Sequence, residues 1–208
     1  MNERSFNSKM SKKPDDSKIE RIRNAAVSII SRRGIANSSV AEIAKEAGVS
    51  AGYLYMHYQG KDALINDLLR IHFNVINEKI SALIETGNNI SNIIVGVVRH
   101  LIDLAIHDKE KMKFIIMLIN DFPLEINPEL TEGINDLTGK LSDILKNNPS
   151  VRDDLVPEDI FLSLIGIPMQ YIALRYNRMI QSDNKNGFDY EHIIRSSRNI
   201  IFKNELKK

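Results

Sequence analysis

Apolar residues recur at helical spacing along most of the chain. In the first segment, which stops at Gly34, they lie three or four residues apart: Ile19, Ile22, Ala26, Ile29 and Ile30. This spacing places the apolar side chains on one face of an α-helix. The segment therefore predicts a helix from Ile19 to Gly34.

The same spacing continues to the end of the chain. It predicts helices over about 40–47, 51–59, 61–85, 90–107, 109–120, 128–147, 157–182 and 190–206. Turn-forming residues separate them, as at Gly48 and Pro149. No stretch of useful length alternates apolar and polar residues as a strand does, and no repeat of fixed period is present. The predicted fold class is all-α.

Composition and charge narrow the function classes. The chain of 208 residues contains no cysteine, which excludes disulfides and thiolate metal sites and fits a reducing compartment. The uncharged run 160–174 is shorter than the roughly 20 residues of a bilayer span, so we expect a buried helix and no membrane association. Residues 1–17 form a polar tail without the apolar stretch of a signal peptide. These features predict a cytoplasmic protein.

Positive charge is concentrated near the N-terminus. Residues 1–61 carry 11 Lys and Arg against 6 Asp and Glu, whereas residues 62–208 carry 17 against 21. One basic end on a mildly acidic body suggests that this end contacts a polyanion.

The window from Ser39 to Lys61 has the pattern of a helix-turn-helix motif at 39–58. Ser39 and Glu42 have the spacing of a capping box, in which each side chain accepts from the other's backbone amide. Gly48 allows the left-handed backbone that ends a helix, and Ser50 can cap the next one. An ordinary helical hairpin has the same outline.

The outward face of the second helix favours DNA binding over a plain hairpin. If Leu54 and Tyr58 point inward, then Gly52, Tyr53 and Met56 point away from the core. A merely solvated face would more often carry Glu and Lys. The pattern therefore indicates a recognition helix.

The run SVAEIAKEAGVSAGYLYMHYQGKDAL, which begins at Ser39, resembles the DNA-binding motif of the tetracycline-repressor (TetR) family of bacterial regulators. The resemblance includes the preceding Arg33-Gly34-Ile35 and covers about residues 18–70. Beyond about residue 75 it extends only to the family's all-helical layout. It implies an N-terminal three-helix DNA-binding domain at 18–77 and a C-terminal helical bundle at 78–208 that binds an effector and dimerises.

The resemblance also implies roles for single residues. Four match positions that usually contact phosphates: Ser39, Tyr55, His57 and Lys61. Four match positions at or near base edges: Ala51, Gly52, Tyr53 and Met56. At Ala41 the chain departs from common members, in which a longer side chain often reaches DNA. Base recognition must then depend on Tyr53, Met56, contacts with thymine methyl groups and DNA shape.

The C-terminal half presents a candidate dimer interface. Residues 160–180 are apolar on nearly every face, so this helix must be covered on more than one side. It is either wholly internal or packed against a partner. The family usually dimerises through its last two long helices as a four-helix bundle, which here are about 157–182 and 190–206.

Several aromatic and Met side chains are candidates for an effector site. They are Phe73, Phe114, Met117, Phe122, Met169 and Tyr171. Such residues are also common in plain cores. The family implies a pocket in this region, and the many apolar side chains predict an apolar or amphipathic small molecule. A ligand against Phe73–Ile76 would tilt the helix 61–85 that leads to the DNA-binding domain.

Other chemistry has little support. His100, Asp103 and His107 share one helix face at a possible metal-ligand spacing, but a solvated polar face is the simpler interpretation. No nucleophile elbow, phosphate-binding loop or dinucleotide fingerprint is present, so we expect no enzyme activity and no cofactor. The leading hypothesis is a ligand-responsive homodimeric repressor of a (pseudo)palindromic operator. The alternative is a helical protein-interaction module that the DNA-binding domain anchors to DNA.

Overall fold

The computed structural model describes residues 15–87, 89–121, 128–146, 148–181 and 187–203. In these residues the secondary structure is helical, apart from one isolated antiparallel bridge between Val151 and Phe202. The all-α prediction is confirmed.

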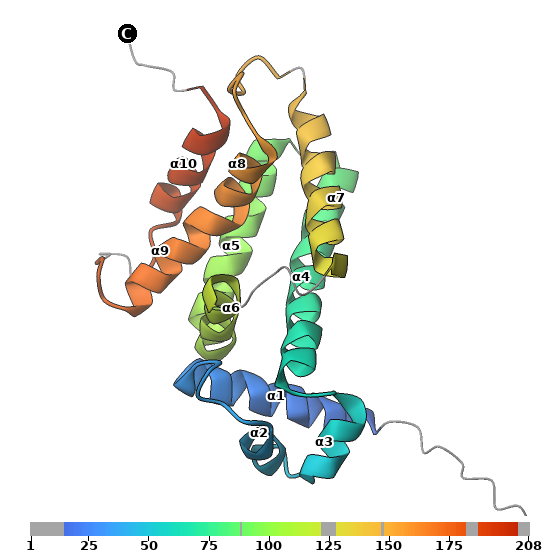
Figure 1. Cartoon of the computed structure of the whole chain (residues 1–208). Helices are drawn as coiled ribbons and strands as arrows, with labels where there is room; N and C mark the ends of the chain where they lie inside the picture. Colours follow the sequence, from blue (N-terminus) through green and yellow to red (C-terminus); the bar gives the residue numbers. More distant parts are fainter. Residues whose placement is uncertain (1–14, 88, 122–127, 147, 182–186, 204–208) are drawn as a thin grey trace, which may run out of the picture.

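Three N-terminal helices form one end of the molecule (Figure 1). They are α1 (Asp16–Arg33), α2 (Val40–Glu46) and α3 (Ala51–His57). Helix α4 (Lys61–Glu85) starts in this unit and continues without a break into the body. It passes through residue 77, the expected boundary between the two domains. The apolar faces meet in a core whose fully buried members include Ile22, Ile30, Ile43, Leu54 and Leu64.

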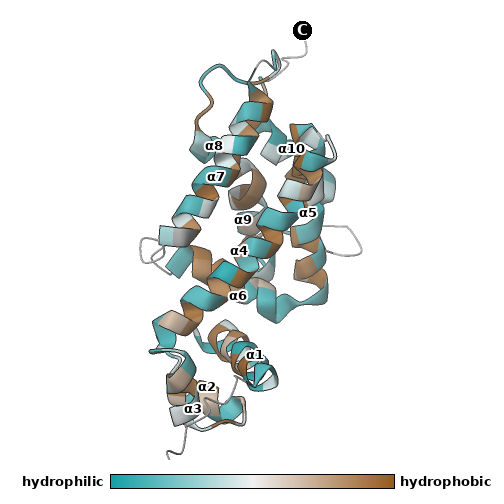
Figure 2. Ribbon diagram, turned by 90° about the vertical axis from the view of Figure 1, so that its right-hand side faces the viewer, coloured by the Kyte–Doolittle hydropathy of each residue, from teal (hydrophilic) through white to brown (hydrophobic). Residues whose placement is uncertain are grey.

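The remaining helices make up the body. They are α5 (Ile90–His107), α6 (Lys109–Asp121), α7 (Pro128–Leu145), α8 (Pro157–Phe161), the π-helical turn η2 (Leu162–Gly166), α9 (Ile167–Tyr176) and α10 (Tyr190–Ile201). Helix α5 packs against α4, α6, α9 and α10. In Figure 2 the apolar stretch of α9 lies in the middle of the body, between α7 and α5. Helix α6 also packs against α1, so the N-terminal unit is joined to the body at both α4 and α6.

Among the described helices, α5 alone has the length and apolar composition that could cross a membrane. Eight of its apolar residues, from Ile90 to Ala105, are buried inside the body. This is the environment of a core helix.

The predicted helix 157–182 is interrupted in its middle, as Pro168 leads one to expect, and only its predicted end is wrong. It consists of α8, η2 and α9, and the amide of Ile167 bonds to the carbonyl of Leu162 in the wider π pattern. Pro168 lacks an amide and cannot continue the regular ladder, which is the expected cause of such an interruption. The helix ends at Tyr176, and Arg178 has a left-handed backbone with φ 57°.

The other helix ends differ less. Helix α10 stops at Ile201 because Phe202 becomes extended and pairs with Val151. Helix α1 begins at Asp16, before the expected start at Ile19, and Asp16 lies in the first turn, where a carboxylate is favourable. Of the expected tail at 1–17, residues 1–14 lie outside the described part of the chain.

We expect the short helix α3 to depend on its N-cap. The Ser50 hydroxyl accepts a hydrogen bond from the Tyr53 amide at 3.1 Å. Ser50→Ala should lower the free energy of unfolding by about 1 kcal/mol, because a helix of seven residues has little intrinsic stability. Urea denaturation followed by circular dichroism measures the change. Ser50→Thr keeps the hydroxyl and serves as the control; an equal loss in both variants would contradict the capping role.

Candidate functional site

The helix-turn-helix motif has the geometry that its sequence predicts. The Ser39 hydroxyl accepts from the Glu42 amide at 3.3 Å, and the Glu42 carboxylate accepts from the Ser39 amide at 3.2 Å. Gly48 has φ 65°, the left-handed conformation expected of the residue that follows α2. The capping box therefore begins α2, and the left-handed turn at Gly48 leads the chain into α3.

The exposed face of α3 carries the candidate DNA contacts. Ala51 and Gly52 at its N-terminus are exposed, as are Tyr55 at 57% and Met56 at 68%. Small residues at a helix N-terminus allow backbone amides to approach a phosphate closely. Large side chains such as Tyr55 and Met56, left uncovered by the fold, are free to enter a groove of DNA.

Tyr53 and His57 do not belong to this exposed face. Their rings pack together with centroids 4.7 Å apart, and the ammonium of Lys18 on α1 lies 5.2 Å from the centre of the Tyr53 ring. Tyr53 Oη and His57 Nε2 are buried without a hydrogen-bond partner. The expectation that Tyr53 points outward is wrong: this residue shares the inner face of α3 with Leu54, because α1 covers more of that face than the pattern indicated.

Lys61 is partly committed to the fold. Its ammonium donates to the carbonyls of Ile35 at 2.6 Å and Ser38 at 3.1 Å. These bonds fasten the α1–α2 connection to the start of α4. An ammonium has three donors, so one remains for a phosphate. Ser39, the other predicted phosphate contact in this region, is exposed.

A charged cluster around Asp67 joins α1, the end of α3 and α4. The Asp67 carboxylate accepts from Tyr58 Oη at 2.8 Å, Arg23 Nε at 2.9 Å and Arg70 at 2.7 Å. Burial opposes the ionisation of Asp67, but these hydrogen bonds outweigh it and lower the pKa of Asp67. Burial and the nearby carboxylate raise the pKa of Tyr58 to about 12. Sequence reasoning placed Tyr58 in the core and missed this cluster, whose only signal was an acidic residue in an apolar stretch.

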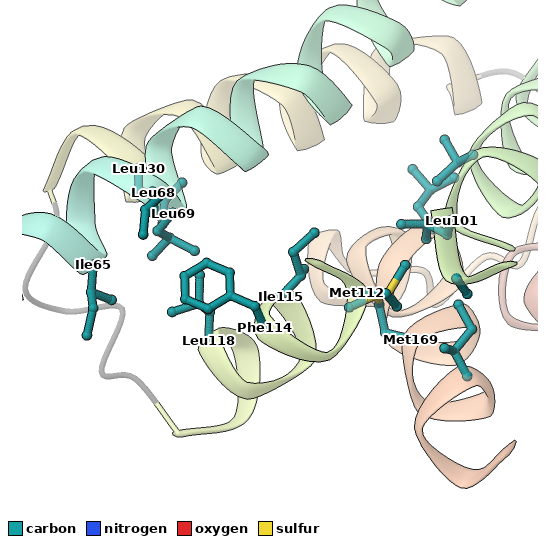
Figure 3. Packing of buried hydrophobic residues seen from close by; sticks show 14 of the residues in the cluster. Ile65, Leu68, Leu69, Leu101, Met112, Phe114, Ile115, Leu118, Leu130 and Met169 are labelled. Carbon is teal, nitrogen blue, oxygen red and sulfur yellow. The ribbon is translucent and has the colours of Figure 1, made fainter. Parts of the chain in front are cut away.

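The body contains an apolar cavity of about 230 Å³ between α4, α6, α7 and the α8–η2 segment. Figure 3 shows part of its wall, where Leu69 of α4 faces Ile115 and Leu118 of α6. Its other apolar lining residues are Phe73, Ile76, Ile80, Ile119, Leu130, Ile134, Leu137, Leu141, Ile160, Phe161, Leu164 and Ile165. The two polar lining residues among those described are His72 and Thr138.

His72 is the titratable group at the cavity. The residue is 8% exposed, its ring packs edge-on against Phe114, and Nε2 has no hydrogen-bond partner. Burial, with a smaller contribution from the positive charge of Lys111, lowers the pKa of His72 to about 4, and Asp108 opposes this only weakly. The ring is therefore neutral at pH 7.

The structure places the six predicted effector contacts in different surroundings. Phe73 lines the cavity. Phe114 and Met169 are buried in the core, and Met117 and Tyr171 are half-buried outside the cavity lining. Phe122 lies outside the described residues. The cavity wall consists mainly of Ile and Leu, which no sequence pattern distinguishes from ordinary core residues.

The polar face of α5 has a structural contact instead of a metal-ligand cluster. In the described part of the chain, no three His, Asp or Glu side chains converge as metal ligands do. His107 Nδ1 lies 2.8 Å from the carbonyl of Asp103, and the Asp103 carboxylate accepts from Tyr190 Oη of α10 at 3.2 Å. This face therefore helps to join α5 to α10.

Comparisons with known proteins identify the N-terminal unit. A family model described as bacterial regulatory proteins, tetR family, matches residues 22–68. The fatty acid metabolism regulator protein of Bacillus subtilis (strain 168) is 28% identical over 150 residues, which cover 69% of this chain and 68% of that protein. The uncharacterized HTH-type transcriptional regulator YerO of the same strain is 24% identical over 136 residues. That match covers 62% of this chain and 45%, less than half, of YerO.

Solved structures share the fold over most of the chain. FadR, a fatty acid degradation regulator from Bacillus halodurans, superposes with a TM-score of 0.69 at 18% identity, covering 95% of this chain and 100% of that one. FadR from Bacillus subtilis, solved in complex with stearoyl-CoA, gives a TM-score of 0.66 at 20% identity, covering 86% and 94%. At these identities the likeness extends to the fold alone.

The buried His72 should make the protein sensitive to acid. Below pH 6.5 the unfolded chain binds a proton at this residue, whereas the folded chain does so only near pH 4, so stability falls as the pH falls through this interval. His72→Phe cannot bind the proton. Wild type should therefore lose about 3 kcal/mol more of its free energy of unfolding than this variant when the pH falls from 8 to 4. Denaturation curves measured across this range test the prediction, and parallel pH profiles would show that His72 is not the acid-sensitive group.

Proposed function

We propose that this chain, whose residues 22–68 match the TetR family of bacterial regulatory proteins, is a DNA-binding transcriptional regulator of that family. In this proposal it is a cytoplasmic homodimeric repressor of a (pseudo)palindromic operator. We propose further that a small apolar or amphipathic effector occupies the cavity and releases the DNA. One observation supports this most: α4 lines the cavity with its middle turns and begins in the DNA-binding unit.

The N-terminal unit supplies two kinds of DNA contact in this proposal. Helix α3 enters the major groove, where Met56 meets base edges and thymine methyl groups. Ser39, Tyr55, Lys61 and the amides at Ala51 bind phosphates, which sets the register without reading sequence. Tyr53 and His57 make no DNA contact in this proposal, because Tyr53 Oη and His57 Nε2 are buried.

The switch acts through the orientation of α4. His72, Phe73 and Ile76 line the cavity on this helix. Asp67, about one and a half turns before His72, binds Arg23 of α1 and Tyr58 at the end of α3. A ligand that tilts α4 would therefore move α3 with it. Two recognition helices bind one face of the duplex only when their separation fits half-sites about 34–36 Å apart or a multiple of that distance.

The proposed dimer interface lies on the α8–α10 side of the body. Leu162 and Met179 are 47% and 71% exposed there, so both side chains are available to a partner. Ile172 and Ile194 are instead buried within the chain, so the apolar circumference of residues 160–180 is only partly available to a partner.

The class of effector follows from the wall of the cavity and is consistent with the relatives. Most of its lining residues are apolar, which favours an aliphatic ligand. FadR from Bacillus subtilis was solved with stearoyl-CoA, a molecule with a long aliphatic chain. We therefore propose that the effector of this protein has a substantial aliphatic part.

Substitutions on α3 and α4 should separate base contacts from phosphate contacts. Lys61→Ala should weaken binding about equally for all sequences and reduce the slope of log affinity against log salt by about one. Met56→Ala should relax the sequence preference, because it removes apolar contacts that contribute about 0.8 kcal/mol for each buried CH₂ group. Fluorescence anisotropy with an operator obtained by DNA selection measures both effects at several salt concentrations.

Lys140→Ala provides the control for charge, because this exposed lysine lies on α7, far from α3. It should leave both the affinity and the salt slope as in wild type. If Lys61→Ala changed the sequence preference but not the salt slope, the phosphate assignment of Lys61 would be wrong.

The switch also predicts reciprocal coupling between effector and operator. A ligand that releases DNA must bind more weakly to the DNA complex by the same factor, for which about 5- to 150-fold is usual. Calorimetric titration of 1-heptanol or stearoyl-CoA into the full chain, with and without operator, measures this factor. Equal affinities for every ligand that binds would rule out the release mechanism and leave the DNA-binding assignment standing.

A further inference from the structure

Helix α7 carries no side chain at the point where Phe73 of α4 meets it. The two helices pack side by side (Figure 1), and the Phe73 ring lies against Gly133. A β-carbon at position 133 would be 2.8 Å from Cε1 and 3.3 Å from Cζ of this ring. Carbon atoms in contact are about 3.5–4.0 Å apart, so the ring occupies the place that a side chain would need. The ring can lie there only because residue 133 is a glycine.

The backbone of α7 does not itself require this glycine. Gly133 lies inside a helix of 18 residues, where alanine is the more favourable residue. Gly139 of the same helix has no atom within 4 Å of its β-carbon position. Of the two glycines of α7, Gly133 alone is therefore explained by a neighbouring side chain.

Phe73 is also part of the cavity wall. This wall includes Ile76 of the same helix, as well as Leu130 and Ile134, which lie on either side of Gly133 in α7. The Phe73 ring is thus in contact with both the backbone of α7 and the cavity. A side chain at position 133 would push the ring away from α7, and the unfilled space beside the ring is the cavity.

The wall and the volume of the cavity define how much of a ligand it holds. Fifteen of its seventeen described lining residues are apolar, so the affinity of an alkyl chain increases with the area that it buries. A water-sized group occupies roughly 30 Å³, so about 230 Å³ holds about eight non-hydrogen atoms. A displacement of the Phe73 ring into the cavity lowers this number.

We propose that Phe73 and Gly133 together set the length of the alkyl chain that the cavity accepts, at about eight non-hydrogen atoms. Phe73 is the wall that the chain meets, and Gly133 is a positioning residue that keeps the ring out of the cavity. This inference rests on the proposed function, in which the cavity holds the effector. It narrows the effector to a molecule whose buried alkyl part is shorter than the stearoyl chain of the ligand solved with FadR.

Calorimetric titration of the full-length protein with the 1-alkanols from 1-butanol to 1-nonanol tests the proposal. The hydroxyl is the same in every probe, so differences along the series come from the alkyl part. In wild type each added CH₂ group should tighten binding about fourfold until the cavity is filled near 1-heptanol, and longer chains should gain nothing further. The length at which the gain stops is the chain-length limit.

Two substitutions should move this limit in opposite directions. Gly133→Ala should shorten it by at least one carbon, because the methyl group drives the Phe73 ring into the cavity. Phe73→Leu should lengthen it by at least one carbon, because the wall loses the outer atoms of the ring. The double variant should have the limit of Phe73→Leu, since the ring's Cδ1 lies at an ordinary contact distance of 3.8 Å from the β-carbon position.

Gly139→Ala is the matched control, because it makes the same exchange in the same helix at a position without a neighbour. It should have the limit of wild type. An unchanged or longer limit in Gly133→Ala would overturn the proposal, because the methyl group would then have moved α7 instead of the ring. The same shortening in Gly139→Ala would also overturn it.

The Phe73 variants cover the case in which Gly133→Ala does not fold. Phe73→Leu keeps the glycine, and an unchanged limit in this variant would show that Phe73 does not end the chain. Recovery of folding in the double variant would support the contact between the two residues. Failure of the double variant to fold would show that Gly133 is needed for another reason, and would overturn its role.

The same probes separate this inference from the proposed function. If all the variants share the limit of wild type and the alkanols release operator DNA, effector sensing stands and the roles of Phe73 and Gly133 are wrong. If no alkanol binds the wild type, both these roles and the effector site in this cavity fail.

Discussion

The continuity of α4 is the constraint on which the rest of the structure depends. Its 25 residues include no glycine or proline, so the backbone ladder is unbroken over about 37 Å. Leu64 and Ile65 are buried at its N-terminal end, and Ile80 is buried in the body. One rigid element thus belongs to both cores, and a change of packing at one end cannot be absorbed by a bend before it reaches the other.

Two polar attachments make the N-terminal unit follow α4. Asp67 holds Tyr58 and Arg23, and Lys61 holds the carbonyls of Ile35 and Ser38. Asp67 is largely shielded from solvent, with a side chain 14% exposed, so salt should screen these contacts less than those of surface ion pairs. The recognition helix is therefore fixed to α4 and α1 by its last residues, while its exposed side chains remain free for DNA.

The sequence predicted elements well where local signals define both ends. Helix α4 was predicted closely, because the Thr86-Gly87 turn marks its end. Helix α10 was not, because its end depends on pairing between Phe202 and Val151, a contact across about fifty residues. The inner face of α3 was misjudged at Tyr53 because a seven-residue helix has too few positions for periodicity to define that face. The cavity was only partly foreseen through Phe73, since an Ile or Leu beside a void has the same sequence pattern as one in a packed core.

The cavity and His72 are locally unfavourable for stability in two separate ways. A void leaves its lining atoms without the contacts that close packing supplies, and a buried ring nitrogen without a partner loses its hydration for no hydrogen bond. Both defects lie at the same place, on the helix that carries the DNA-binding unit. A sequence shaped by packing alone would fill this space with a larger apolar side chain and place an apolar residue at position 72. A molecule that fills the void contacts the middle turns of α4 directly, and it shifts this helix only as far as it binds one orientation more tightly than the other.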